Sequence, residues 1–392
     1  MPKPDLSQRI GRYVTASAVG ERVRAYIPMP LPPSPPVDTS ALAGLISEAM
    51  HALGRLDGVR AVAPDTSLFL YMYVRKEALL SSQIEGTQSS LSDLLLYESD
   101  AAPGAPIDDA AEVSTYVAAL NHGLRRMADG FPLSLRLLRE MHGILLATGR
   151  GSTKQPGEFR TSQNWIGGTR PGNALFVPPP PGDVPDLMSK LEAFLHEDES
   201  GLPVIIKAGL AHVQFETIHP FLDGNGRLGR LLITLYLCER GLLREPLLYL
   251  SLYFKTNRRT YYDLLQEVRE HGRWEAWLEF FLTGVRDVAR GAHEAAHCIS
   301  ELFEADLETV KTLGRAAPTA GAVLQVLQQR PVISIRKAAE LIETSFPATA
   351  KALTHLEELG LIDEISGKQR GRVYAYSRYL EILSEGTEPL KN

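Results

Sequence analysis

Apolar residues recur at three- and four-residue intervals over most of this 392-residue chain, and this spacing predicts α-helices. In the first half, the predicted helices cover residues 39–56, 65–82, 110–127 and 133–146. Helices resume at residue 184 and continue through residues 211–217, 227–240, 260–270 and 274–308. The pattern therefore predicts a mainly α-helical protein, long enough for a sizeable core and for two or three domains.

Three segments interrupt the helical pattern. Residues 28–36, PMPLPPSPP, predict an extended arm, because proline lacks a backbone donor and fixes φ. We interpret this arm as a stiff lead-in packed along the next domain rather than as a ligand for a proline-reading partner. Gly157–Val177, rich in Gly, Asn, Thr and β-forming residues and followed by Pro178–Pro181, predicts a hairpin or flap. A break at Gly314–Pro318 precedes shorter helices at 319–329, 334–342 and 346–359.

Composition excludes several classes of protein. Hydrophobic residues make up 44% and charged residues 22% of the chain, and no apolar run approaches the ~18 residues of a membrane span. The N-terminal residues lack an apolar signal core, and the two cysteines, Cys238 and Cys298, exclude a disulfide framework. These features predict a cytoplasmic location with no membrane partner. The net charge of −6 gives no global attraction for nucleic acid.

The segment His219–Arg230, HPFLDGNGRLGR, is the strongest functional candidate. Pro220 disfavours helical geometry at His219, so the preceding helix is predicted to end there and to leave His219 at a loop mouth. Asp223–Gly226 form a turn, and Arg227 opens an apolar helix. A glycine-bearing turn at a helix N-terminus leaves backbone amides free, and with the helix dipole these predict a site for a phosphate chain.

The charged residues of this segment fit the same chemistry. Arg227 and Arg230 lie on one helix face, where their guanidinium groups can hold phosphate oxygens, and Gly229 permits close approach. Asp223 supplies a hard oxygen ligand for Mg²⁺. His219, with an ordinary pKa of about 6.5, can take a proton from a hydroxyl. Together these residues predict a nucleotide-using transferase.

Each of these features has a weaker alternative. A histidine in a turn, spaced arginines and Gly-Asn-Gly are often only structural, but twelve residues combining all of them favour a functional site. Helical spacing also allows His212, Glu216 and His219 to bind a metal. We disfavour that alternative because Pro220 turns His219 away from the helix.

The segment HPFLDGNGRLGR resembles the signature of the Fic family and matches it without departure. In that family the enzyme usually moves AMP from ATP onto a protein hydroxyl. The resemblance implies that His219 is the base, Asp223 the Mg²⁺ ligand and Phe221 the anchor of the loop. The residues it assigns to ATP binding are Phe221, Gly224, Asn225, Gly226, Arg227 and Arg230.

Three further segments extend the resemblance. Related Doc-type kinases carry a lysine where this loop has Gly226, so its absence favours AMP transfer over phosphorylation. Gly157–Val177 is similar to the family's flap, which aligns a substrate segment by β-augmentation. Arg258–Leu265, RRTYYDLL, looks like the family's adenosine-side helix. There Tyr262 is either a nucleotide contact or a buried packing residue.

Ser81–Gly86, SSQIEG, resembles the family's inhibitory helix. Alone it predicts only a helix end, because Gly86 suits the position after the last turn. The resemblance implies that Ser81 and Glu85 are inhibitory and that Glu85 pairs with Arg230, the last arginine of the signature. The pair would occupy the guanidinium needed by the γ-phosphate, so ATP could bind only in a poor pose.

The C-terminal residues 319–376 resemble a winged helix-turn-helix. Two short helices, Ile335–Ile342 and Ala348–Leu359, precede a hairpin with its tip at Ser366–Gly371. The basic residues that could touch a phosphate backbone are Lys351, His355, Lys368, Arg370 and Arg372. The acidic residues close by are Glu357, Glu358, Asp363 and Glu364. The expected partner is therefore DNA, another protein or a second copy of the chain.

The predicted architecture is a mainly α Fic fold with a β-hairpin flap and a C-terminal winged helix-turn-helix. The predicted parts are an N-terminal extension (1–40), a helical region with the inhibitory helix (41–110), the Fic core (111–313) and the winged-helix-like domain (318–392). The predicted function is transfer of AMP from ATP, with Mg²⁺, to a Tyr, Thr or Ser hydroxyl of a target protein or of the chain itself. The alternatives are a nucleotide-sensing DNA-binding regulator and a Fic enzyme that uses another nucleotide or removes AMP.

Overall fold

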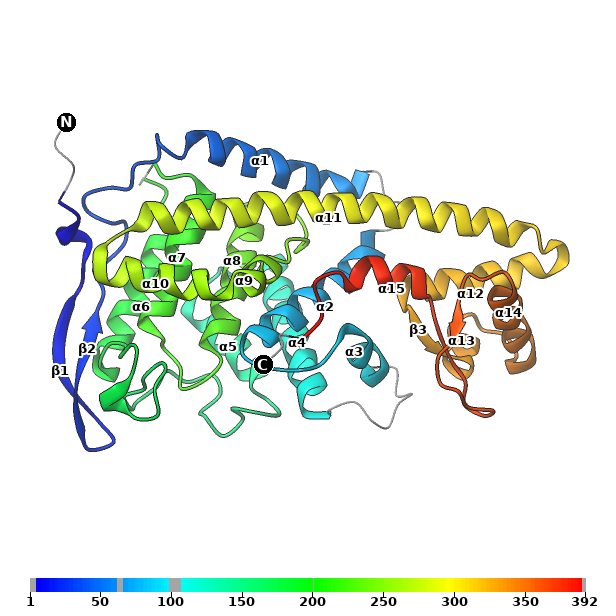
Figure 1. Cartoon of the computed structure of the whole chain (residues 1–392), viewed down its shortest axis with the longest axis horizontal. Helices are drawn as coiled ribbons and strands as arrows, with labels where there is room; N and C mark the ends of the chain where they lie inside the picture. Colours follow the sequence, from blue (N-terminus) through cyan, green and yellow to red (C-terminus); the bar gives the residue numbers. More distant parts are fainter. Residues whose placement is uncertain (1–4, 62–65, 99–106, 200, 390–392) are drawn as a thin grey trace.

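The structure is a computed structural model that describes residues 5–61, 66–98, 107–199 and 201–389. It is mainly helical, as predicted, and the predicted helices are present with their ends shifted by a few residues (Figure 1). The helices up to the long C-terminal-side helix are α1 (Ala43–Asp57), α2 (Thr66–Ile84), α3 (Leu91–Glu98), α4 (Ile107–Ala128), α5 (Leu135–Leu145), α6 (Val184–His196), α7 (Val204–Ile218), α8 (Asn225–Glu239), α9 (Ser251–Thr256), α10 (Arg258–His271) and α11 (Trp274–Lys311). The short helices α3 and α9 were not predicted.

Two helices form the centre of the core. Residues 205–218 of α7 are all buried, although they include polar residues such as His212 and Glu216, and α7 packs against α8. The 38-residue helix α11 runs alongside α1 and past α7 (Figure 1). Trp277 of α11 is fully buried and donates from Nε1 to Gly209 O at 2.9 Å. This packing fixes the C-terminal end of α7, where the candidate loop begins.

A β-hairpin, which the sequence analysis did not predict, precedes the helices within the N-terminal extension. Strands β1 (Arg12–Ala18) and β2 (Glu21–Ile27) pair antiparallel. Val19 and Gly20 at the turn both have positive φ, 48° and 79°, as a two-residue hairpin turn requires. The hairpin lies against the flap segment, because the Tyr26 N–H donates to Val177 O at 2.9 Å.

The proline-rich arm packs along the helical core. Gln214 donates from Nε2 to Met29 O at 2.9 Å. Arg9, only 4% exposed, donates to Pro35 O and Pro36 O, both at 2.7 Å. The arm is therefore a packed lead-in, the interpretation that the sequence favoured.

The segment predicted to be a hairpin or flap is less regular than a two-stranded hairpin. Residues 157–177 contain a single antiparallel bridge, Ile166 with Phe176, instead of two strands. The ladder ends there because Gly167 and Gly168 have positive φ, 68° and 72°, and a short 3₁₀ turn covers Pro171–Asn173.

The C-terminal part contains α12 (Ala317–Gln329), β3 (Val332–Ser334), α13 (Ile335–Leu341), α14 (Phe346–Glu358), β4 (Asp363–Glu364), β5 (Val373–Ala375) and α15 (Ser377–Ser384). The strands form an antiparallel sheet in the order β3-β5-β4. Helix α15 packs against α11 and α2, and the chain then returns to the core (Figure 1). There Gln83 donates from Nε2 to Thr387 O at 2.8 Å. Among the helices of the described residues, none is long and apolar enough to cross a membrane.

Candidate active site

The candidate loop begins where α7 ends at Ile218. His219 adopts a left-handed conformation, φ 49° and ψ 61°, and its N–H closes the last turn by donating to Phe215 O at 2.9 Å. A non-glycine residue in this conformation costs about 1–2 kcal/mol, so the surroundings must hold it. The buried Arg160 does so by donating to His219 O at 2.9 Å, to Ile218 O at 3.3 Å and to Pro179 O at 2.6 Å.

His219 is unprotonated in this environment. Burial, followed by the charges of Arg160 and Arg269, lowers the pKa of His219 to about 3. Its Nδ1 has no hydrogen-bond partner within the described part of the chain. A neutral imidazole with a free ring nitrogen can accept a proton from an incoming hydroxyl.

The rest of the loop is held rigidly from inside. Phe221 is fully buried and stacks on His142 with ring centroids 3.7 Å apart. Asn225 closes the loop, since its Oδ1 accepts from Phe221 N at 2.9 Å and its Nδ2 donates to Phe221 O at 2.8 Å. His142 accepts from Gly157 N at Nδ1, 2.8 Å, so its Nε2 carries the proton and donates to Asp223 O at 3.0 Å.

Helix α8 presents its N-terminus at this loop. Gly224 precedes the helix with φ 75°, and no side chain caps the first turn. The N–H groups of Asn225, Gly226 and Arg227 precede the first intrahelical donor, Leu228 N, which bonds Gly224 O at 3.0 Å. Uncapped amides at the positive end of a helix dipole form a site for an anion.

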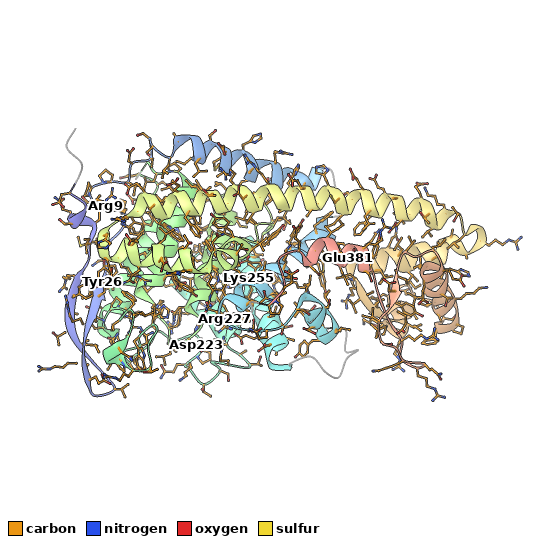
Figure 2. All side chains as sticks on the ribbon, in the orientation of Figure 1. Arg9, Tyr26, Asp223, Arg227, Lys255 and Glu381 are labelled. Carbon is orange, nitrogen blue, oxygen red and sulfur yellow. The ribbon has the colours of Figure 1, made fainter. Side chains whose placement is uncertain are left out.

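Both arginines of the motif are buried beside this N-terminus. Figure 2 shows the position of Arg227 near Asp223. The side chain of Arg227 is 1% exposed and forms an ion pair with Glu112, and its Nη2 lies 3.5 Å from Asp223 Oδ1. Asp223 remains 31% exposed, and its Oδ1 accepts from Gly224 N at 2.6 Å. Its second carboxylate oxygen can therefore face a bound cation.

Arg230 is held entirely by the end of α2. Its Nε donates to Ser81 Oγ at 2.8 Å, and its Nη2 donates to Ser81 O at 2.9 Å and to Glu85 Oε1 at 2.8 Å. Burial raises the pKa of Glu85, but the Arg230 guanidinium outweighs that effect and leaves the pKa lowered. The structure thus brings together all three residues of the predicted inhibitory contact.

The alternative metal cluster does not form. His212 uses both ring nitrogens inside the protein, on Gly229 O at 2.9 Å and on Tyr261 Oη at 2.8 Å. Among the described residues no group of three or more His, Cys, Asp or Glu is arranged to hold a metal ion. Tyr262 is 40% exposed and lies 5.0 Å from Tyr261 between ring centroids, so it is not a buried packing residue.

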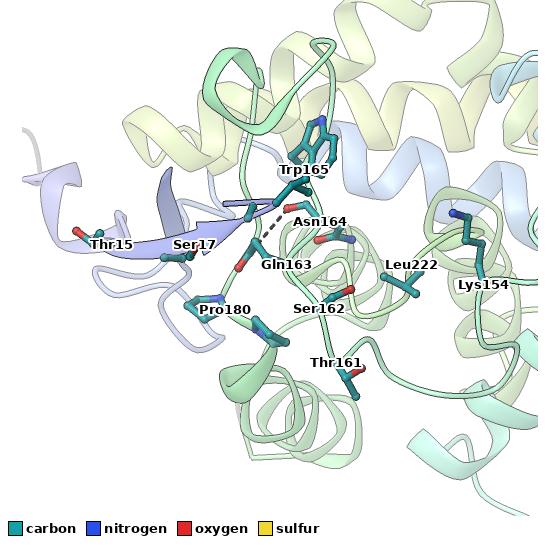
Figure 3. A pocket seen from close by; sticks show the side chains of 14 residues that line it. Thr15, Ser17, Lys154, Thr161, Ser162, Gln163, Asn164, Trp165, Pro180 and Leu222 are labelled. Atoms are coloured by element: carbon teal, nitrogen blue, oxygen red, sulfur yellow. Dashed lines mark hydrogen bonds between the residues drawn. The ribbon is translucent and has the colours of Figure 1, made fainter. Parts of the chain in front are cut away.

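A groove of about 800 Å³ leads away from the loop (Figure 3). Its walls are Thr15–Val19 of the hairpin and Thr161–Trp165 of the flap segment, and Leu222 of the candidate loop lines it. The buried oxygens Gln163 Oε1 and Asn164 Oδ1 have no hydrogen-bond partner in the described chain. The side chains of Gln163 and Asn164 line the groove beside the loop.

The sequence analysis missed four supports of this site. Three side chains contact the loop from 115, 81 and 59 positions away in the sequence: Glu112, His142 and Arg160. No motif around them predicts these contacts. The hairpin Arg12–Ile27 could have been found, because a Val-Gly turn joins two segments rich in β-branched and aromatic residues.

Comparison with known proteins agrees with the motif and the fold. Residues 43–125 match the family model described as Fic/DOC family N-terminal, and residues 132–237 match the Fic/DOC family model. Residues 43–125 and 132–237 are therefore Fic/DOC family domains. The chain is 34% identical over 191 residues to the protein adenylyltransferase Fic of Culex quinquefasciatus. That match spans 48% of this chain and 35% of the relative.

Two solved structures share the fold. A Fic family protein from Desulfovibrio desulfuricans G20 has a TM-score of 0.56 at 21% identity, covering 87% of this chain and 97% of that one. A Fic domain containing signaling protein from Bacteroides thetaiotaomicron has a TM-score of 0.51 at 20% identity, covering 64% of this chain and 97% of that one. At these identities the likeness concerns the fold alone.

Proposed function

We propose that this chain is a protein adenylyltransferase that moves AMP from ATP to a Tyr, Thr or Ser hydroxyl and releases pyrophosphate. One observation carries the proposal: the uncapped N-terminus of α8, the buried Arg227 and Arg230, and the neutral His219 surround a single loop. The similarity to the Culex protein adenylyltransferase supports it.

In the proposed reaction, the hydroxyl oxygen of the target attacks the α-phosphorus, and the bond from that phosphorus to the bridging oxygen of pyrophosphate breaks. His219 takes the hydroxyl proton on its neutral imidazole ring. The amides of Asn225 and Gly226 and the Arg227 guanidinium stabilise the phosphate charge. The exposed Asp223 carboxylate would hold Mg²⁺, which neutralises phosphate charge when bound.

The end of α2 would inhibit the transfer reaction. The γ-phosphate needs a guanidinium, and the hydrogen bonds of Arg230 to Ser81 and Glu85 already engage it. Glu85 also places a negative charge beside the α8 N-terminus, because a Cβ built on Gly226 would lie under 3.0 Å from Glu85 Oε1. Both effects disfavour the productive pose of the phosphate chain.

The groove would receive the target. An extended segment of the target protein would lie between the β1–β2 hairpin and residues 161–165, with its hydroxyl directed past Leu222. Such a segment would lie against the side chains of residues 161–165, which line the groove.

The C-terminal residues 318–392 would form a winged helix-turn-helix that contacts a protein, a second copy of the chain or DNA. Helices α13 and α14 followed by the β4–β5 pair support this assignment. The large apolar side chains of Leu341 and Phe346 are 41% and 54% exposed, which favours protein contact.

The test is incubation with ATP labelled either at the α- or at the γ-phosphate, followed by mass spectrometry of labelled proteins. Label from the α-phosphate should appear on protein, and label from the γ-phosphate should leave with pyrophosphate. Transfer of γ-label would make the protein a kinase. Preferred use of another nucleotide, or loss of AMP from an AMP-modified protein, would replace the proposal with the corresponding Fic reaction. Specific, salt-dependent DNA binding without transfer would support a regulator.

A further inference from the structure

Arg227 is held along one edge by a carboxylate from a distant helix. Glu112 of α4 pairs through Oε1 with Arg227 Nη1, and the two side chains are 4% and 1% exposed. Glu112 has a second basic neighbour, because Arg150 Nη2 lies 3.4 Å from the same oxygen. A buried carboxylate held between two guanidinium groups fixes the position of Arg227.

The opposite edge of Arg227 is unused. Its Nη2 lies 3.5 Å from Asp223 Oδ1, which is an ion pair rather than a hydrogen bond. Its Nε is buried and has no hydrogen-bond partner among the described residues. The Nε and Nη2 donors form the side-on fork of a guanidinium, which matches two oxygens of a phosphate. A buried Nε without an acceptor, next to an Nη2 that reaches the Asp223 carboxylate only at 3.5 Å, indicates an anionic ligand beside Asp223 and the α8 N-terminus.

We propose that Glu112 is a positioning residue that holds Arg227 by Nη1 so that the Nε–Nη2 fork points at the phosphate chain of ATP. The inference rests on the proposed nucleotide site and adds a residue to it. Glu112 differs from Glu85 in the edge it uses. Glu85 occupies the Nη2 of Arg230, part of its side-on fork, whereas Glu112 leaves the corresponding fork of Arg227 free.

A role for Glu112 as a competitor of phosphate predicts a change of ATP affinity in the opposite direction. If Glu112 competed with phosphate for Arg227, its removal would add net positive charge to the site and strengthen ATP binding. If Glu112 positions the fork, its removal leaves the Arg227 side chain free to change rotamer, and ATP binding weakens. The sign of the change in Kd therefore separates the two roles.

The experiment measures Kd by calorimetry for the α,β-methylene analogue of ATP with Mg²⁺, using the full chain carrying Glu85→Gly. Glu112→Ala should weaken binding at least tenfold. Glu112→Gln, which keeps an acceptor for Nη1 but no charge, should weaken it about threefold and remains measurable if the alanine variant does not fold. An unchanged or tighter Kd in the folded variants would overturn the proposal.

Two further measurements exclude a merely structural effect. Once Arg227 is alanine, adding Glu112→Gln should change Kd by less than twofold, because no guanidinium remains to be positioned. An additional loss of the same size as in the Arg227 protein would show that Glu112 acts elsewhere. The control is Glu275→Ala, which breaks the ion pair with Arg9 (2.7 Å) and should lower thermal stability without changing Kd. Figure 2 shows that Arg9 lies far from Arg227.

Steady-state rates separate this inference from the proposed function. Glu112→Gln should raise KM for ATP in proportion to Kd and lower kcat by less than twofold, whereas a structural defect would mainly lower the active fraction. If no variant transfers AMP while the Kd series follows the prediction, the proposed reaction fails and the positioning role of Glu112 stands. If AMP transfer occurs while the Kd is the same with and without Glu112, the proposed reaction stands and the positioning role of Glu112 fails.

Discussion

The Glu85 carboxylate and the backbone of Gly226 approach each other so closely that no side chain fits between them. A Cβ built on Gly226 would lie under 3.0 Å from Glu85 Oε1, although Gly226 belongs to the first turn of α8 and has no positive φ. Glycine is therefore required here by the approach of Glu85 and not by backbone conformation. The same approach puts Glu85 Oε1 within 2.8 Å of Arg230 Nη2.

This contact predicts an unusual pair of stabilities for Gly226→Ala. In the wild-type background the new methyl group must displace Glu85 from Arg230, so thermal unfolding should show a loss of about 1–3 kcal/mol. In the Glu85→Gly background the clash with the carboxylate is gone and only the flexible end of Arg230, with Nη1 at 3.0 Å, has to give way, so alanine in the helix should be neutral or should stabilise by up to about 1 kcal/mol. Equal losses in both backgrounds would show that the methyl group clashes elsewhere.

His219→Ala should abolish AMP transfer, because the imidazole accepts a proton and does not bind phosphate. The melting temperature should stay nearly unchanged, and the Kd for ATP should change by less than about twofold. The pKa of His219, lowered to about 3, adds a condition. In the Glu85→Gly enzyme, kcat/KM should not fall through protonation of this histidine between pH 8 and pH 5. Transfer by the alanine variant near the wild-type rate would remove His219 from the mechanism.

Much of this architecture follows from local sequence. The helices follow from the apolar spacing, and Pro220 and Gly224 place the ends of the two helices that flank the loop. The pairing of Glu85 with Arg230 could be predicted only through the family resemblance, because 145 residues separate them.

The supports of the loop could not be predicted in this way. Arg160 lies in the flap segment and His142 in α5, and no motif marks either residue. Their role depends on where the chain folds back onto His219 and Asp223. The β-forming residues of the flap segment predict regular strands, but the backbone at Gly168 prevents them. Gly168 has positive φ, and a Cβ there would lie under 3.0 Å from Asn173 O.

Burial of Glu216 predicts a dependence of stability on pH. The residue is 6% exposed, its Oε1 has no hydrogen-bond partner in the described chain, and burial raises its pKa from 4.5 to about 7. A carboxyl group with a raised pKa in the folded state binds its proton more tightly there than in the unfolded chain. Its presence therefore costs stability progressively as pH rises from about 4.5 to about 7.

Glu216→Gln should consequently stabilise the protein relative to wild type more at pH 8 than at pH 4.5, by up to about 3 kcal/mol. Chemical denaturation at both pH values measures the difference, and the exposed Glu294→Gln controls for loss of one negative charge. A difference that is independent of pH would mean that Glu216 is ionised at both values and is stabilised by Arg230 and Arg269.

The predicted inhibitory contact gives the most demanding prediction. Glu85→Gly removes the carboxylate from Arg230 Nη2 and frees the guanidinium for the γ-phosphate, so auto-modification with α-labelled ATP should rise at least tenfold. Most substitutions at a structural or catalytic position lower activity, so a gain is hard to obtain by accident. Ser81 still bonds Arg230 through Oγ and the backbone, which keeps the side chain in place after the mutation. In the double mutant with Arg230→Ala no guanidinium remains to be released, and the gain should disappear. A gain that survives the loss of Arg230, or a Glu85→Gly protein no more active than wild type, would show that the end of α2 does not inhibit transfer through this contact.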